Sequence, residues 1–127
     1  MICIAVCIAA HAVLANAVVG AAPSPVQPAF GNTIVSTYPD GRKARLWLRP
    51  DGVYAIKGRT GVRSSGHWSV RGDKLCLRQS RPFPVLFNFC SPIPTGLSGG
   101  SWTAKVFTGE TVRMEVVRGD DQFEAPR

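Results

Sequence analysis

The sequence predicts an all-β fold, a single antiparallel up-and-down meander of about eight strands that forms a small closed or half-open barrel. Short runs alternate between apolar and polar residues from residue 32 to residue 118, as half-buried strands do. Turn-forming residues divide these runs at intervals of about ten residues. The turns also set registers that place apolar side chains opposite one another, and closure of the sheet would remove its exposed edges.

Eight segments show this alternating pattern between turn residues. We expect strands at residues 32–38, 42–49, 53–59, 66–71, 74–79, 85–90, 101–108 and 111–118. The inward positions carry Trp68, Trp102, Phe87, Phe89, Tyr54, Leu46, Leu48, Leu75 and Leu77. Side chains of this size would largely fill a barrel of eight strands, so a roomy cavity is not expected.

Two of the predicted turns share the pattern Pro-Asp-Gly, at residues 39–41 and 50–52. Proline suits the first turn position, and glycine suits the left-handed position that closes a three-residue hairpin loop. These loops place Leu46 opposite Ile56 and beside Ile34, which are all apolar. The register therefore supports the strand assignment.

Two further hairpins are closed by other turns. Gly72-Asp73 fits a two-residue turn, and Thr108-Gly109-Glu110 closes the last hairpin. The expected pairs are Trp68 with Leu77, Val70 with Leu75, and Trp102, Ala104 and Val106 with Val116, Met114 and Val112. A wrong strand assignment would scramble at least one of these registers.

Charge is distributed unevenly along the 127 residues, which carry a net charge of +7. No charged side chain precedes Asp40. Residues 1–22 are small and apolar, which predicts a secretory signal peptide cleaved between about Ala17 and Ala22. An uncleaved membrane anchor is the alternative. Export would place the protein in a bacterial periplasm or outside the cell.

The chain after the signal peptide divides into three segments. Residues 23–31 are rich in proline and predict a spacer, residues 32–118 form the barrel domain, and residues 119–127 form an acidic flexible tail. A chain of this length allows one domain and excludes a multidomain enzyme. We expect it to be a monomer without stable membrane insertion once the signal is removed.

Export also changes the cysteine count, because Cys3 and Cys7 leave with the signal peptide. Cys76 and Cys90 then remain, and two cysteines in an oxidising compartment form a disulfide in most cases. Both occupy outward positions of neighbouring strands, so a hairpin can pair them. The bridge would close a loop of about 15 residues, worth about 3 kcal/mol in the chain-entropy model.

The residues Gly66-His67-Trp68 resemble the G-x-W strand opening of lipocalin-like barrels and of small periplasmic inhibitors of secreted proteases. With its Cys-bearing strand and second cysteine, the domain also resembles small secreted β-proteins of alphaproteobacteria over residues 31–118. In lipocalins the motif lies on the first strand, whereas here it lies mid-chain. The resemblance implies a barrel that binds a ligand or a target protein without catalysis.

The sequence contains no set of catalytic residues, metal ligands or cofactor motifs that is typical of an enzyme. His67 is the only histidine after the signal peptide, and no acid is fixed near it in sequence. Asp40, Asp51 and Asp73 are explained as turn residues. No phosphate-binding or dinucleotide-binding motif occurs. We therefore expect no enzymatic activity, no metal and no cofactor.

Positive charge is the remaining feature that predicts function. Between Arg42 and Arg81 there are eleven Lys or Arg and two Asp. We expect an outward face that binds an acidic partner through its cations and one tryptophan. Its predicted residues are Lys43, Arg45, Trp47, Arg49 and Lys57.

The partner of this face would be an envelope glycan, a lipid head group or an acidic protein, and export argues against a specific nucleic-acid partner. A solvated outer face with the tryptophan covered is the simpler interpretation of the same residues. Two further alternatives stay open, a lipocalin-like carrier of a small apolar ligand and an inhibitor of a secreted hydrolase. If the protein were itself a hydrolase, its His67 would have to lie within hydrogen-bond reach of a Ser or Glu side chain.

Overall fold

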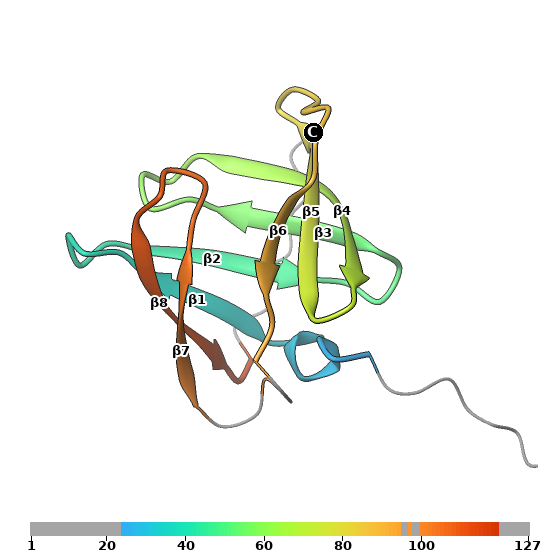
Figure 1. The fold of residues 1–127 in the computed structure, drawn as a ribbon. Coiled ribbons are helices and arrows are strands. Elements are labelled where there is room, and N and C mark those ends of the chain that lie inside the picture. The colour runs from blue at the N-terminus through green and yellow to red at the C-terminus, as the bar shows by residue number, and fades with distance from the viewer. Residues whose placement is uncertain (1–23, 95–96, 98–99, 120–127) are drawn as a thin grey trace, which may run out of the picture.

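The computed structural model describes residues 24–94, 97 and 100–119, and the predicted signal peptide and almost all of the predicted tail lie outside them. The described residues form eight strands of one antiparallel sheet and one turn of 3₁₀ helix, η1 (Figure 1). The elements are η1 (Gln27–Ala29), β1 (Thr33–Thr37), β2 (Lys43–Leu48), β3 (Val53–Lys57), β4 (Arg63–Arg71), β5 (Lys74–Arg81), β6 (Phe89–Pro92), β7 (Ser101–Lys105) and β8 (Thr111–Val117).

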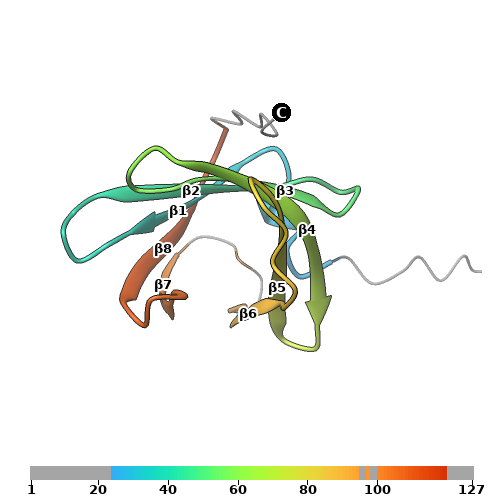
Figure 2. The same cartoon turned by 90° about the horizontal axis from the view of Figure 1, so that it is seen from above.

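The strands form a nearly closed barrel, which confirms the predicted fold class. Each strand pairs with the next along the chain except at β6 and β7, and β1 pairs with β8. Figure 2 shows the curved sheet with β6 and β7 at its two ends. Prolines flank this seam, at residues 82 and 84 before β6 and at residues 92 and 94 at its end. Proline has no N–H to donate, so a longer ladder on β6 is disfavoured.

The short turns determine most registers as expected. Leu46 lies opposite both Ile34 and Ile56, and Trp68 lies opposite Leu77. The loops 39–41 and 50–52 each end in a glycine with positive φ, whose N–H donates to the carbonyl three residues earlier. Local turn chemistry is therefore sufficient to align these strands.

The register of the last hairpin differs from the prediction by two residues. Trp102 lies opposite Met114 and Ala104 opposite Val112, rather than opposite Val116 and Met114. The loop is residues 107–109, because Gly109 takes the left-handed third position with a φ of 86°. The sequence pattern predicts this loop one residue later, at 108–110.

The strand predicted at residues 85–90 is β6, which begins only at Phe89. The chain between β5 and β6 is irregular. The Val85 N–H in this connection donates a hydrogen bond of 3.0 Å to the Gln79 carbonyl of β5. Pro82 and Pro84 explain the delay, since neither can donate to a ladder. Phe87 consequently lies outside the sheet and is exposed.

The segment predicted as a spacer contributes to the core. Val26 and Ala29 are 0% and 1% exposed and pack with Leu48, Tyr54 and other core residues. In a 3₁₀ turn residues three apart share a face, so η1 directs both side chains inward while Pro28 is tolerated in its first turn. The spacer prediction for residues 23–31 is therefore wrong for this part of the segment.

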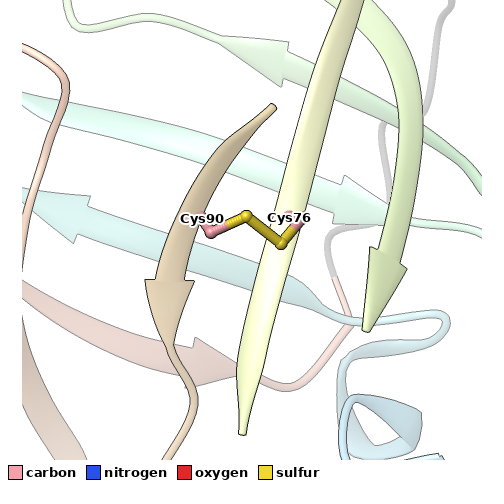
Figure 3. The surroundings of a disulfide bond; sticks show 2 residues. All are labelled: Cys76 and Cys90. Atoms are coloured by element: carbon pink, nitrogen blue, oxygen red, sulfur yellow. A yellow bond between two sulfur atoms is a disulfide. The ribbon is translucent and has the colours of Figure 1, made fainter. Parts of the chain in front are cut away.

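The predicted disulfide joins Cys76 of β5 to Cys90 of β6 (Figure 3). The two residues are direct cross-strand partners, and Leu77 lies opposite Phe89. Because β6 has β5 as its only strand partner among the described residues, the bridge attaches an edge strand covalently to the sheet.

Candidate functional site

The two ends of the barrel differ in their packing. Because successive strands run in opposite directions, successive connections lie at alternate ends of the barrel. The β1–β2, β3–β4, β5–β6 and β7–β8 connections lie at one end, which we call the open end. The remaining connections and η1 lie at the other, which we call the closed end. Core residues of the closed end include Val26, Leu48, Tyr54 and Leu97, with Trp68 and Trp102 packed against them.

A cavity of about 230 Å³ occupies the inner face of the sheet toward the open end. Most of its lining side chains are apolar, and turn residues of the β1–β2 and β7–β8 connections border it. A smaller hollow of about 40 Å³ extends toward the closed end and shares four lining residues with the larger one. The barrel interior is thus not filled, contrary to the prediction.

Small side chains account for the cavity. Ser36 and Ala44 are direct cross-strand partners, and Ser36 also lies opposite Met114. Ala104 lines the same cavity from β7. These small inward side chains leave volume at the open end that larger lining residues such as Leu77 and Phe89 do not fill. The missed sequence signal was the set of small residues at inward positions 36, 44 and 104.

The open seam between β6 and β7 is bridged by aromatic rings rather than by a strand ladder. Phe107 stacks on Phe87, with ring centroids 5.9 Å apart, and contacts Phe89 edge-on at 6.3 Å. Phe107 and Phe89 also line the cavity, and Phe107 is 72% exposed. We call these three residues the aromatic seam. Phe89 and Phe107 form part of the cavity mouth.

An ionic cluster connects three turns of the open end. Arg59 of the β3–β4 turn makes a bidentate pair with Glu110, at 3.1 and 2.9 Å, and lies 3.6 Å from Asp40. Its guanidinium also lies 4.2 Å from the ring centroid of Tyr38. Hydrogen bonds from Arg59 and Thr108 lower the pKa of Glu110. This cluster holds the rim of the cavity together, since Tyr38 is one of its lining residues.

Burial raises the pKa of Tyr38, although the neighbouring Arg59 charge acts in the opposite direction. The phenol therefore stays protonated at neutral pH and can donate or accept a hydrogen bond at the rim. Burial also raises the pKa of Tyr54 to about 12, so this core phenol is neutral as well. Neither tyrosine supplies a charge to the interior.

The cations of the predicted binding surface lie on and beside β2 and β3. Lys43 is exposed, and Arg45 lies opposite Lys57, as the register predicted. Arg49 is exposed just after β2 and pairs with Asp51 at 2.7 Å. These residues do share one face of the sheet.

The structure adds Arg63 to this face. Arg63 of β4 lies opposite Lys57, so Arg45, Lys57 and Arg63 form a row of cations across three strands. The Nη1 atom of Arg63 is buried and has no hydrogen-bond partner among the described residues. Like charges directly opposite one another destabilise a sheet, so this row is not explained by strand pairing.

Trp47 does not present its ring to solvent, contrary to the expectation for the binding surface. Its side chain is 1% exposed, and its indole Nε1 donates to Thr33 Oγ1 at 3.0 Å. Val35 and Ala55, which are also on the outer face, are buried too. An outward strand position here carries a packed tryptophan, in agreement with the simpler interpretation that it is covered.

His67 lies exposed in β4, cross-strand from Val53 and Arg78. Residues 24–94, 97 and 100–119 bring no three His, Cys, Asp or Glu side chains together in a way that could hold a metal ion. Within the same residues, no helix has the length and apolar character needed to cross a bilayer.

No family model matches the chain, and neither a curated protein nor a solved structure shows significant similarity to it. The resemblance of Gly66-His67-Trp68 to lipocalin-like barrels and periplasmic protease inhibitors therefore stays a prediction.

Proposed function

We propose that the protein is an exported, non-enzymatic binding module that holds a small apolar ligand in the open end of its barrel. The observation that carries this proposal is the cavity of about 230 Å³ with mainly apolar walls. A dry cavity of about 150 Å³ is large enough for benzene. The ligand class is therefore a medium-length alkyl chain or an apolar ring system somewhat larger than one ring.

The walls favour such a ligand because each buried methylene contributes about 0.8 kcal/mol. Leu46, Leu77 and Met114 provide aliphatic surface, and Phe89 and Phe107 provide aromatic surface near the mouth. The hydroxyl of Tyr38 is a polar group at the rim for a ligand head. This arrangement suits a molecule with an apolar body and one polar end.

Calorimetric titration with a series of linear alcohols, from butan-1-ol to decan-1-ol, tests the proposal. Affinity should rise with each methylene and level off once the chain fills the cavity. Absence of binding for the whole series, or affinity that does not depend on chain length, would contradict it.

A matched pair of variants localises the ligand. Ala104→Leu places extra volume in the cavity from β7, while Thr103→Leu makes a similar change at the exposed neighbouring position. Octan-1-ol affinity should fall at least tenfold in Ala104→Leu and stay unchanged in Thr103→Leu. Circular dichroism and urea unfolding of both variants confirm that the fold is retained. Equal affinities in two folded variants would place the ligand elsewhere.

Export is part of this proposal and is supported by the Cys76–Cys90 bridge, because disulfides persist in oxidising compartments. The proposed signal peptide, residues 1–22, lies outside the described residues. Mass spectrometry of protein recovered outside the cytoplasm would give the mature N-terminus, expected between about residues 18 and 23. An intact Met1 in that material would contradict cleavage.

The cation row supports a second candidate function, contact with an acidic partner across β2, β3 and β4. The specific observation is the row of Arg45, Lys57 and Arg63, which stand at directly opposed positions of three neighbouring strands and could contact several anionic groups at once. Binding to a sulfated polysaccharide such as heparin should weaken steeply with salt and fall in Lys57→Glu. Lys74→Glu, in an exposed residue near the closed end, is the control. Equal losses in both variants would indicate attraction by net charge alone.

A further inference from the structure

Five of the six exposed large apolar side chains of the described residues lie at the open end. Leu86 is 85% exposed, and Val62, Phe83, Phe87 and Phe107 are each more than half exposed. They belong to the β3–β4, β5–β6 and β7–β8 connections, which lie along the upper part of Figure 1. We call these five residues the apolar tips. Three separate connections thus carry apolar residues into solvent at the end where the cavity opens.

Cations form a second layer just behind the apolar tips. Five strands carry a lysine or arginine as their terminal residue on this side. These residues are Lys43 of β2, Lys57 of β3, Arg63 of β4, Arg81 of β5 and Lys105 of β7. We call them the cation collar.

The acidic groups of the described open end do not neutralise this collar. Asp40 and Glu110 both lie within ion-pair distance of Arg59, which is not a collar residue. Asp40 also lies 4.0 Å from Arg42, which is outside the collar as well. The collar therefore leaves a net positive ring around the apolar tips.

We propose that the open end docks on the surface of an anionic lipid bilayer. Aromatic and aliphatic tips would enter the head-group boundary, and the collar would lie at the level of the lipid phosphates. Charge complementarity favours an anionic bilayer over a neutral one, because polybasic surfaces are attracted to anionic lipid. The layered order of tips first and cations behind matches the layered order of acyl chains and phosphates.

The docking proposal stands independently of the ligand proposal, although the two fit together. A cavity that opens among inserted tips would receive an apolar chain directly from the bilayer. Docking requires only the exposed tips and the collar, whereas the alcohol titrations require only the cavity. Failure of one therefore leaves the other to be judged by its own measurement.

Co-sedimentation with lipid vesicles tests the proposal. The probe is a vesicle of phosphatidylcholine with or without phosphatidylglycerol. Wild-type protein should sediment with the mixed vesicles, with affinity at least tenfold higher than for phosphatidylcholine alone and decreasing as salt is added. No sedimentation, or equal binding to both vesicle types, would overturn the proposal.

A double variant, Phe83→Ser with Leu86→Ser, removes two apolar tips that are largely exposed, so the fold should be retained. Val117→Ser is the matched control, because Val117 is also exposed, at 38%, but ends β8 at the closed end. Vesicle affinity should fall at least tenfold in the double variant and stay unchanged in Val117→Ser. Equal affinity in the double variant and wild type would overturn the proposal.

Two measurements distinguish lipid docking from other roles of the apolar tips. Sedimentation velocity without lipid would reveal self-association, and a wild-type dimer that the double variant abolishes would overturn lipid docking in favour of a second copy. Octan-1-ol titration of the double variant should give the wild-type affinity, which would show that the cavity survives while docking is lost. Loss of both activities would overturn the assignment of the tips to docking alone.

Discussion

Gly66 and Trp68 show what the Gly-x-Trp sequence does in this barrel. Gly66 lies where the register of β4 against β5 shifts, and a Cβ there would overlap the carbonyl of Arg78. Trp68 packs on Phe30 with ring centroids 5.7 Å apart, and its Nε1 donates to the Arg49 carbonyl at 2.7 Å. Glycine therefore allows two backbones to approach, and tryptophan joins three segments at the closed end.

Gly66→Ala should destabilise the protein by about 3 kcal/mol, because the added methyl group meets backbone rather than a flexible side chain. Gly100→Ala is the control, since a Cβ at that position meets nothing within 4 Å. Urea unfolding measures both. Similar stability of the two variants would show that the β4–β5 irregularity adjusts without cost.

Trp47 shows that an outward position in a strand does not make a side chain exposed. Alternation correctly places it on the outer face beside the cations, yet its side chain is packed and hydrogen-bonded to Thr33. Removal of a buried tryptophan side chain costs about 3–5 kcal/mol. Loss of partner binding in Trp47→Ala would therefore report loss of the fold, and Lys57 is the better residue to change.

At the level of elements, β6 is the strand with the weakest attachment by hydrogen bonds. It has four residues, pairs only with β5 among the described strands, and follows an irregular connection. The Cys76–Cys90 bridge and the aromatic seam compensate, one on each side of the strand. The disulfide thus secures one wall of the cavity, because Phe89 and Ser91 of β6 line it.

Replacement of both cysteines, Cys76→Ser with Cys90→Ser, should lower the free energy of unfolding by about 3 kcal/mol, the value for a loop of about 15 residues. Backbone amides of β6 should lose hydrogen-exchange protection before those of β3, which has a strand on both sides. A reducing agent should bring wild type to the stability of the variant and leave the variant unchanged. Full protection of β6 without the bridge would contradict this role.

For the whole molecule, the contrast between the two ends relates fold to function. The closed end is packed with large side chains and η1, whereas the open end has small inward residues, exposed tips and an ionic cluster. The Arg59–Glu110 pair joins the β3–β4 and β7–β8 turns across the open end. This pair makes the stability of the rim depend on pH.

The pKa of Glu110 is lower in the folded protein than its ordinary value of 4.5. Its ionisation therefore contributes stability that is present above about pH 4.5 and is lost as the pH falls through the lower folded pKa. Glu110→Gln should be less stable than wild type at pH 7, and the two should converge in acid. Urea unfolding between pH 7 and pH 2 measures the difference.

The control for this prediction is the same substitution in an Arg59→Gln background. Without Arg59, the Thr108 hydrogen bond still lowers the pKa of Glu110, so the pH-dependent effect of Glu110→Gln on stability should become smaller but not vanish. A pH-dependent difference of undiminished size in that background would show that Arg59 is not its source. The double-mutant cycle thus isolates the pair from the rest of the charge.

The sequence by itself determined the meander, most strand registers and the Cys76–Cys90 pairing. These features depend on neighbouring segments, and a turn of defined length aligns the two strands that it joins. The basic character of β2 and β3 and the pairing of Arg45 with Lys57 follow from the same local information. The one register error, in the last hairpin, came from placing the loop around Gly109 one residue late.

The tertiary structure alone decided the closure of β1 on β8, the gap between β6 and β7, the burial of Trp47 and the core role of Val26 and Ala29. It also decided the cavity, which arises because Ser36, Ala44 and Ala104 meet at one end of the barrel. Each of these features depends on the curvature of the sheet and on contacts between residues far apart in the chain. Alternation specifies which face a residue occupies, but only packing specifies whether that face is filled.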